Sequence, residues 1–260
     1  MLKRIAAALM VIALTTLSSV GVASMPTSTP PSERINMTYL HLGTPAQQLQ
    51  YIDRTKGALD IVAPSYFDLN ADGSLLFNSS KYQASFVEEM HRRGIKVVPY
   101  LSNHWDQNAG RVALTNRELL TTQIAEAIKK YQLDGVNVDI ENLTEVDRDN
   151  YTDLVRLLRT KLPDKQVSVA VPANPKRRTT GWVGCYDNAK LSEYADYLML
   201  MAYDESYRGS PERPVASIQF VEGAIQTILD EGVSPAKVVL GISFYGRIWG
   251  GDGSMIGDGL

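Results

Sequence analysis

Hydrophobic and polar positions alternate with two different periods along the chain, and this pattern predicts strands that alternate with helices. Short runs rich in β-branched residues predict strands at 36–40, 59–64, 96–101, 135–141, 166–171, 197–202 and 238–243. Apolar residues spaced three and four apart predict helices at 45–54, 82–93, 116–131, 145–162, 190–194 and 217–231. Gly94 and Pro163 follow two of these helices, as residues that end a helix do. This alternation indicates parallel strands covered by helices.

Seven strands with six intervening helices favour a (β/α)8 TIM barrel over an open sheet. The residues after Ser243 are few and rich in glycine, so they do not supply an eighth strand with its flanking helices. We therefore expect an α/β barrel of about seven strands that is truncated at its C-terminus. Its first and seventh strands would then expose unpaired edges.

The first residues of the chain have the pattern of a secretory signal peptide, which we predict at 1–24. Lys3 and Arg4 precede an apolar run, and small residues follow that run. Residues 25–34, rich in Pro, Ser and Thr, predict a linker before a catalytic barrel at 35–260. An uncleaved anchor is the alternative, but the apolar run is short for a membrane span and no other segment is suited to one. We expect a protein that is secreted or associated with a cell wall or spore.

Composition and charge argue against several classes of protein. The 260 residues carry a net charge of −3 and are 44% hydrophobic, which is typical of a globular domain and gives no indication of nucleic-acid binding. The basic run 176–178 predicts a solvated loop, with contact to an anionic polymer as the alternative. The one cysteine, Cys185, allows no intramolecular disulfide. The three histidines lack metal-ligand spacing, so we expect no metal. We also expect no cofactor and a monomer.

The segment 133–141 carries the clearest indication of chemistry. Because side chains alternate along a strand, Asn137, Asp139 and Glu141 share one face, and the apolar residues between them share the other. In a barrel the polar face would point inward, with Glu141 at the C-terminal mouth where barrel enzymes have their active sites. Two neighbouring carboxylates raise the affinity of the pair for a proton, which suits Glu141 to act as an acid near neutral pH. An exposed edge strand is the alternative.

Three segments resemble motifs of glycoside hydrolase family 18. Residues 134–141 are similar to the fourth-strand signature Asp-Gly-x-Asp-x-Asp-x-Glu. Residues 199–204 resemble the sixth-strand Met-x-Tyr-Asp, and residues 240–247 resemble the seventh-strand Gly-x-Pro-x-Tyr-Gly-Arg. The motifs lie in the expected order on the predicted strands, and the resemblance runs from about residue 35 to 249.

Two departures from the family pattern indicate a branch within it. Asn137 stands where the pattern has its first inner aspartate, and residues 97–103 replace the usual third-strand Ser-x-Gly-Gly. Both features resemble bacterial spore-cortex and cell-wall N-acetylglucosaminidases, as does the segment 66–73.

The resemblance implies hydrolysis of β-1,4 glycosidic bonds next to N-acetylglucosamine, in peptidoglycan or chitin. The mechanism would be retaining and substrate-assisted, with the substrate's acetamido group as nucleophile. Glu141 would protonate the leaving oxygen and later activate water. Asp139 would accept the acetamido N–H, while Tyr203 would donate its hydroxyl to the acetamido oxygen.

The resemblance also implies supporting roles at the barrel mouth. Asn137 would hold Asp139 from below, Asp204 would bind the sugar at the cleavage point, and Tyr245 and Arg247 would contact substrate. The alternatives are rim aromatics for both tyrosines and a surface ion pair for Arg247. For the whole protein, the alternatives are a chitinase-like lectin that binds sugar without cutting it, and an incomplete barrel without activity. The presence of Glu141 favours the enzyme, because such lectins commonly lose the terminal acid.

Overall fold

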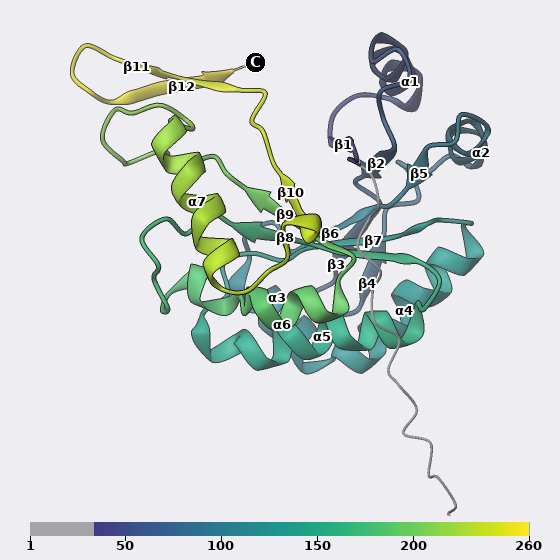
Figure 1. The fold of residues 1–260 in the computed structure, drawn as a ribbon. Coiled ribbons are helices and arrows are strands. Elements are labelled where there is room, and N and C mark those ends of the chain that lie inside the picture. Colours follow the sequence, from purple (N-terminus) through teal and green to yellow (C-terminus); the bar gives the residue numbers. More distant parts are fainter. Residues whose placement is uncertain (1–33, 260) are drawn as a thin grey trace, which may run out of the picture.

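The computed structural model describes residues 34–259 (Figure 1). The predicted signal peptide lies outside the described residues, and so does the predicted linker apart from Arg34. Between residues 34 and 259, no helix combines the length and the apolar character needed to cross a membrane.

The second and third strand positions of the fold are each divided between two sheets. β1 (Met37–Leu40) pairs in parallel with β2 (Ile61–Pro64), and β2 pairs with β5 (Lys96–Val97). The chain continues from β2 into β3 (Phe67–Leu69) and from β5 into β6 (Tyr100–Ser102), which belong to the second sheet. The predicted strand 96–101 is thus interrupted. Its break includes Pro99, which has no N–H to donate to a ladder.

The second sheet continues the parallel order of the first. β6 pairs with β7 (Gly135–Asp139), followed by β8 (Gln166–Pro172), β9 (Tyr197–Met201) and β10 (Val238–Leu240). All seven predicted strands are therefore confirmed, in the neighbour order of a barrel. Among the described residues no pairing joins β10 to β1, so the sheet is open there and no closed barrel is present.

Two hairpins of the structure were not predicted from the pattern. β4 (Leu75–Phe77) lies antiparallel to β3 at the edge of the second sheet. β11 (Gly246–Trp249) and β12 (Met255–Gly259) form a separate antiparallel pair, drawn in yellow in Figure 1. Both hairpins are short, and their glycine-rich or polar turn residues interrupt the alternation of hydrophobic and polar positions that would predict strands.

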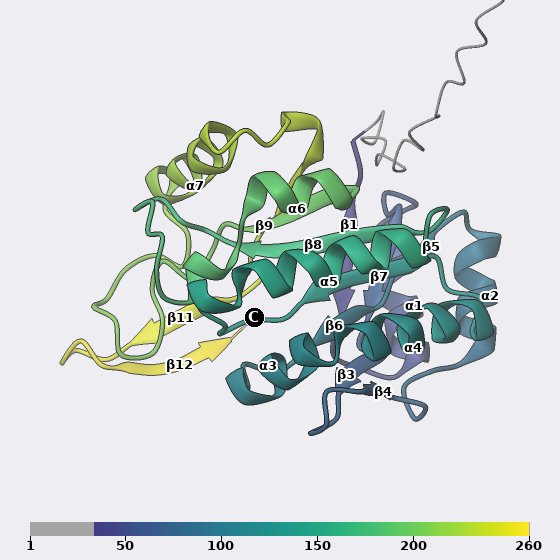
Figure 2. The same ribbon diagram turned by 90° about the horizontal axis from the view of Figure 1, so that it is seen from below.

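The helices agree with the predicted periodicity. The structure has α1 (Pro45–Arg54), α2 (Ala84–Arg92), α4 (Arg117–Lys130), α5 (Arg148–Lys161), α6 (Asn188–Tyr194) and α7 (Ile218–Asp230), with 3-10 turns η1 (Glu145–Asp147), η2 (Trp182–Cys185) and η3 (Pro235–Lys237). Helices α4, α5 and α6, together with α3 (Gln107–Thr115), lie along one side of the second sheet (Figures 1 and 2).

One further helix, α3 (Gln107–Thr115), was not predicted. Asp106 begins it, because its carboxylate accepts the backbone N–H of Ala109 at 3.0 Å. Gly110 weakens the helical pattern, but its lack of a side chain allows close packing. A Cβ at this position would come within 3.0 Å of the Leu143 side chain and 3.1 Å of the Asn103 amide. This close approach brings α3 against the loop that follows β7.

The apolar core lies on both faces of the strands. The large cluster between sheet and helices includes Val136, Val138 and Ile140, each fully buried, which confirms the predicted apolar face of β7. A second cluster on the inner face includes Ile61 and Met199, with Tyr203 packed against it. Apolar packing on both faces therefore holds the strands in place, and this positions the residues at their C-terminal ends.

Candidate active site

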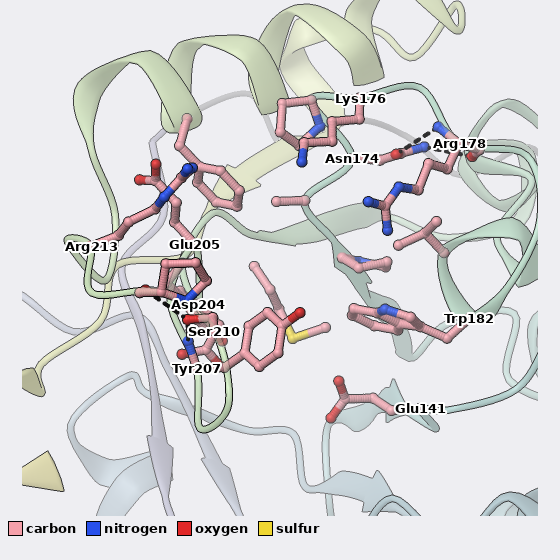
Figure 3. A pocket seen from close by; sticks show the side chains of 18 of the residues that line it. Glu141, Asn174, Lys176, Arg178, Trp182, Asp204, Glu205, Tyr207, Ser210 and Arg213 are labelled. Carbon is pink, nitrogen blue, oxygen red and sulfur yellow. Dashed lines mark hydrogen bonds between the residues drawn. The ribbon is translucent and has the colours of Figure 1, made fainter. Parts of the chain in front are cut away.

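Glu141 lies in a cleft at the C-terminal ends of the strands (Figure 3). The cleft has a volume of about 780 Å³, and its lining includes Trp105, Trp182, Tyr203 and Asp204. The predicted strand 135–141 ends earlier, at Asp139, so Glu141 lies just beyond the strand ladder. Glu141 nonetheless lies at the C-terminal ends of the strands, where it was predicted.

Burial controls the proton affinity of the two carboxyl groups. Removal from water raises the pKa of Asp139 to about 6, and the charge of His104 opposes this rise. For Glu141, burial is again the largest cause, followed by the charges of Asp139 and Asp204, and together they raise its pKa to about 8. The expected repulsion between the carboxylates thus contributes, but less than burial. Glu141 is mainly protonated at neutral pH.

Asn137 has other partners than the predicted one. Its Oδ1 accepts the hydroxyl of Tyr39 at 2.7 Å, and its Nδ2 donates to Ser168 Oγ at 2.9 Å. Asp139 Oδ1 is buried and has no hydrogen-bond partner among the described residues. The expectation that Asn137 holds Asp139 from below is therefore corrected. Residues two apart on a strand are about 7 Å apart, so the amide reaches the neighbouring strands instead.

The remaining predicted residues gather around Asp204. Tyr245 Oη donates to Asp204 Oδ1 at 2.6 Å, and Arg247 Nη2 binds the same oxygen. Arg247 Nε also donates to the Ser206 carbonyl at 2.7 Å. Among the described residues, Tyr203 and Asp204 line the cleft, whereas Tyr245 and Arg247 are not part of its lining. Arg247 thus forms an ion pair with Asp204, but its side chain is only 9% exposed, whereas its alternative interpretation was a surface ion pair.

Tyr203 stands close enough to both carboxyl groups to respond to their charge. Burial, followed by the charges of Asp139 and Glu141, raises the pKa of Tyr203 well above its usual range. Its hydroxyl therefore keeps its proton and remains a hydrogen-bond donor at neutral pH. The ring of Tyr245 lies 6.2 Å from that of Tyr203, at nearly a right angle.

A row of polar side chains beside Asp139 was missed in the sequence. In the strand register, Asp68 of β3 pairs with Ser102 of β6, and Ser102 pairs with Asp139 of β7. His104 follows in a left-handed conformation (φ 48°) and its Nε2 lies 2.8 Å from Asp68 Oδ1. The available signal was the polar segment 102–104 directly after a predicted strand, at the end where barrel sites form.

Two tryptophans of the cleft lining lie beside one another. The ring centroids of Trp105 and Trp182 are 5.2 Å apart, and Trp182 lines the same cleft as Glu141 (Figure 3). Flat aromatic faces of this kind bind the apolar faces of sugar rings. Neither residue was among the predicted site residues, because loop tryptophans also pack on barrel cores.

Within the described part of the chain, no group of three His, Cys, Asp or Glu side chains is arranged to hold a metal ion. Cys185 is buried, and burial raises the pKa of its thiol to about 12. A thiol rather than a thiolate at neutral pH is a poor nucleophile.

The sequence matches known proteins over most of its length. The family model described as glycosyl hydrolases family 18 matches residues 35–258. The uncharacterized glycosylase YvbX of Bacillus subtilis is 27% identical over 203 residues, which are 74% of this chain and 58% of YvbX. The cortical fragment-lytic enzyme of Bacillus subtilis is 26% identical, over 70% of this chain and 44% of that enzyme. The chain thus spans about half the length of these curated relatives.

Solved structures agree with the arrangement of strands and helices. The spore cortex-lytic enzyme SleL of Bacillus cereus superposes with a TM-score of 0.74 at 19% identity, over 84% of this chain and 54% of SleL. The chitinase of Chromobacterium violaceum gives a TM-score of 0.72 at 23% identity, over 81% of this chain and 69% of the chitinase. These likenesses show an α/β fold of the TIM-barrel type.

Proposed function

The chain belongs to glycosyl hydrolases family 18, and from this membership we propose that it hydrolyses β-1,4 bonds next to N-acetylglucosamine in peptidoglycan or chitin. The observation that carries the proposal is the position of Glu141 in an aromatic-lined cleft, where burial and the neighbouring carboxylates raise its pKa to about 8. A glycosidic oxygen is a poor leaving group, and a carboxylic acid that keeps its proton at neutral pH is what its departure requires.

The reaction that we propose uses the substrate's own acetamido group. The acetamido carbonyl oxygen attacks the anomeric carbon while Glu141 gives its proton to the departing oxygen. The Glu141 carboxylate then takes a proton from water, which opens the cyclic intermediate with retained configuration. No second catalytic carboxylate is needed as nucleophile, so Asp139 is available for another role.

Asp139 and Tyr203 hold the acetamido group in this proposal. Asp139 Oδ1, without a hydrogen-bond partner among the described residues, accepts the acetamido N–H. This contact orients the carbonyl oxygen and stabilises positive charge on the intermediate. The Tyr203 hydroxyl donates to the acetamido oxygen.

Asp204 binds a sugar hydroxyl at the cleavage point. Tyr245 and Arg247 act on substrate through Asp204, because both bind its Oδ1 and orient the carboxylate. This replaces the direct sugar contacts first expected of them. Trp105 and Trp182 provide the stacking surface for adjacent sugar rings.

We further propose that the protein is exported and acts at a cell wall or spore. The support is the predicted signal peptide at 1–24 together with the names of relatives and neighbours, which include a cortical fragment-lytic enzyme and a spore cortex-lytic enzyme. An N-acetylglucosamine-containing polysaccharide is the partner that this location offers.

The test is release of reducing ends from chitooligosaccharides and from peptidoglycan strands by the full chain. We expect hydrolysis of at least one of them by the unaltered protein and by Glu126→Gln, an exposed change on α4. Glu141→Gln should bind the sugar without cutting it, since the change removes the acid at nearly constant shape. Binding without hydrolysis by the unaltered protein would instead identify a lectin.

A further inference from the structure

The side chains of the basic run 176–178 point in two different directions. Arg177 has a left-handed backbone (φ 52°), and its guanidinium pairs with Asp230 at the end of α7. Lys176 and Arg178, on either side of it, belong to the lining of the cleft. In Figure 3 both lie above Trp182, while Glu141 lies below that ring. The run therefore supplies two cations to the cleft and one to the surface.

A turn closed by Asn174 fixes the backbone that carries these cations. The Arg178 N–H donates to Asn174 Oδ1 at 2.9 Å, and Asn174 Nδ2 donates to the Arg178 carbonyl at 2.9 Å. The Arg177 N–H donates to the Asn174 carbonyl, also at 2.9 Å. Lys176 and Arg178 are thus presented from an ordered turn, which reduces the entropy lost when they bind a ligand.

A third cation, Arg213, enters the lining from the loop between β9 and α7. Figure 3 shows it across the cleft from Arg178. Glu205 fastens this loop at two points, because its N–H donates to the Val215 carbonyl at 2.9 Å and its Oε2 accepts the Ser217 N–H at 2.8 Å. Two separately braced loops therefore bring positive charge to one cleft.

These three cations have no protein partners within residues 34–259, as no ion pair or hydrogen bond involves the side chain of Lys176, Arg178 or Arg213. Three acidic side chains also line the cleft. Asp204 is paired with Arg247, and burial raises the pKa of Glu141, which favours its neutral form, so Glu205 is the remaining acidic group against the three cations. The chain as a whole carries a net charge of −3, so this local excess does not follow from a basic composition.

We propose that Lys176, Arg178 and Arg213 form an anion-binding wall that selects glycan strands bearing carboxylates over neutral poly-N-acetylglucosamine. The ligand is a peptidoglycan strand, in which every second sugar carries a lactyl ether or the peptide acids attached to it. The assignment rests on the proposed function for the sugar chain's position in the cleft. A guanidinium binds a carboxylate through two parallel hydrogen bonds, whereas chitin offers only hydroxyl and acetamide groups.

The test compares two ligands that differ only in charge. Calorimetry measures binding of the full chain carrying Glu141→Gln, which should not cut the ligand, to glycan strands of alternating N-acetylglucosamine and N-acetylmuramic acid, and to the same strands with their carboxyls converted to methyl amides. We expect the charged strands to bind about tenfold more tightly at low salt, since three exposed contacts each contribute a small factor, and the ratio to fall as salt is added. Equal affinity for both strands would overturn the proposal.

Variants assign the preference to these side chains. The triple change Lys176→Gln, Arg178→Gln, Arg213→Gln should abolish the preference, and Arg178→Gln alone should reduce it. Arg177→Gln is the matched control, because its guanidinium is held by Asp230 outside the cleft, and it should keep the preference of the unaltered protein. An equal loss in Arg177→Gln would overturn the assignment by indicating a general surface field.

Binding and hydrolysis separate this inference from the proposed function. Charge-selective binding without release of reducing ends would refute the hydrolase and support the anion-binding wall. Hydrolysis of both strands with equal affinity and equal kcat/KM would support the hydrolase and refute the wall.

Discussion

Asn103 and Glu141 are joined by two hydrogen bonds of 2.8 Å, in which the Asn103 amide donates to the Glu141 carbonyl and accepts the Glu141 N–H. Strand β7 ends at Asp139, so this side chain takes the place of a ladder partner for the proposed acid. Asn103 is 3% exposed and also donates to the Asp106 carbonyl at 2.9 Å. One amide thus couples the end of β7 to the start of α3.

The first prediction concerns this amide. Asn103→Ala leaves the Glu141 N–H and carbonyl without partners at a buried position, so we expect the free energy of unfolding to fall by about 1–3 kcal/mol. We also expect kcat to fall, because the backbone of Glu141 is no longer held. Urea denaturation and reducing-end assays measure both. The control is Asn150→Ala, exposed on α5; unchanged stability and kcat in Asn103→Ala would contradict the role.

The pH dependence of hydrolysis follows from the two raised pKa values. The reaction requires Asp139 ionised and Glu141 protonated, so activity should rise as pH passes about 6 and fall as pH passes about 8. The measurement is kcat/KM on a chitooligosaccharide from pH 4 to 10. A maximum below pH 5, where Asp139 is protonated, would contradict these assignments.

His104 should set the position of the acidic limb. The charge of His104 lowers the pKa of Asp139 against the effect of burial, so removal of the imidazole should move this limb to higher pH. His104→Asn is the suitable change, because asparagine tolerates the left-handed backbone at this position. His91→Asn, which removes an imidazole bound to Asp134 before β7, is the control and should leave the limb in place.

Stability should change with pH in the opposite sense to that of a salt-bridged carboxylate. The pKa of Glu141 is higher in the folded chain than in the unfolded chain, so its contribution is fully present below about pH 4.5 and is lost as pH rises through about 8. Glutamine does not ionise. The free energy of unfolding of Glu141→Gln, relative to that of the unaltered protein, should therefore increase between pH 5 and 9, by on the order of a few kcal/mol. A pH-independent difference in urea titrations would refute the buried, raised carboxyl.

Local periodicity was sufficient to predict the strands and the polar face of β7. Val136, Val138 and Ile140 identify the buried face, and the alternation then assigns Asp139 and Glu141 to the other face without any knowledge of neighbours. The helix α3 was not predictable in the same way. Gly110 lowers its local helical signal, and the reason for this glycine is a contact with Leu143 and Asn103 that only the folded chain forms.

Partners across strands explain what the sequence did not predict in the site. Asn137 bonds to Tyr39, 98 positions earlier, rather than to Asp139 on its own strand. The row from Asp68 to Asp139 depends on strand register, which one chain's hydrophobic pattern does not specify for polar residues at strand ends. Motif resemblance identified residues that lie together on one strand. His104 was missed because its partners, Asp68 and Asp139, lie on two other strands.

The central claim is that Glu141 gives a proton to the leaving oxygen. Its most direct test compares a substrate whose leaving group requires that proton with one whose leaving group does not. The measurement is the first-turnover rate of Glu141→Gln on a chitooligosaccharide and on an N-acetylglucosamine glycoside of a strongly acidic nitrophenol, which departs without protonation. On the oligosaccharide we expect a loss on the order of 10²–10⁴-fold, and on the activated glycoside a loss of about tenfold or less. Equal losses on both substrates, or full activity on the oligosaccharide, would contradict the assignment of Glu141 as the acid.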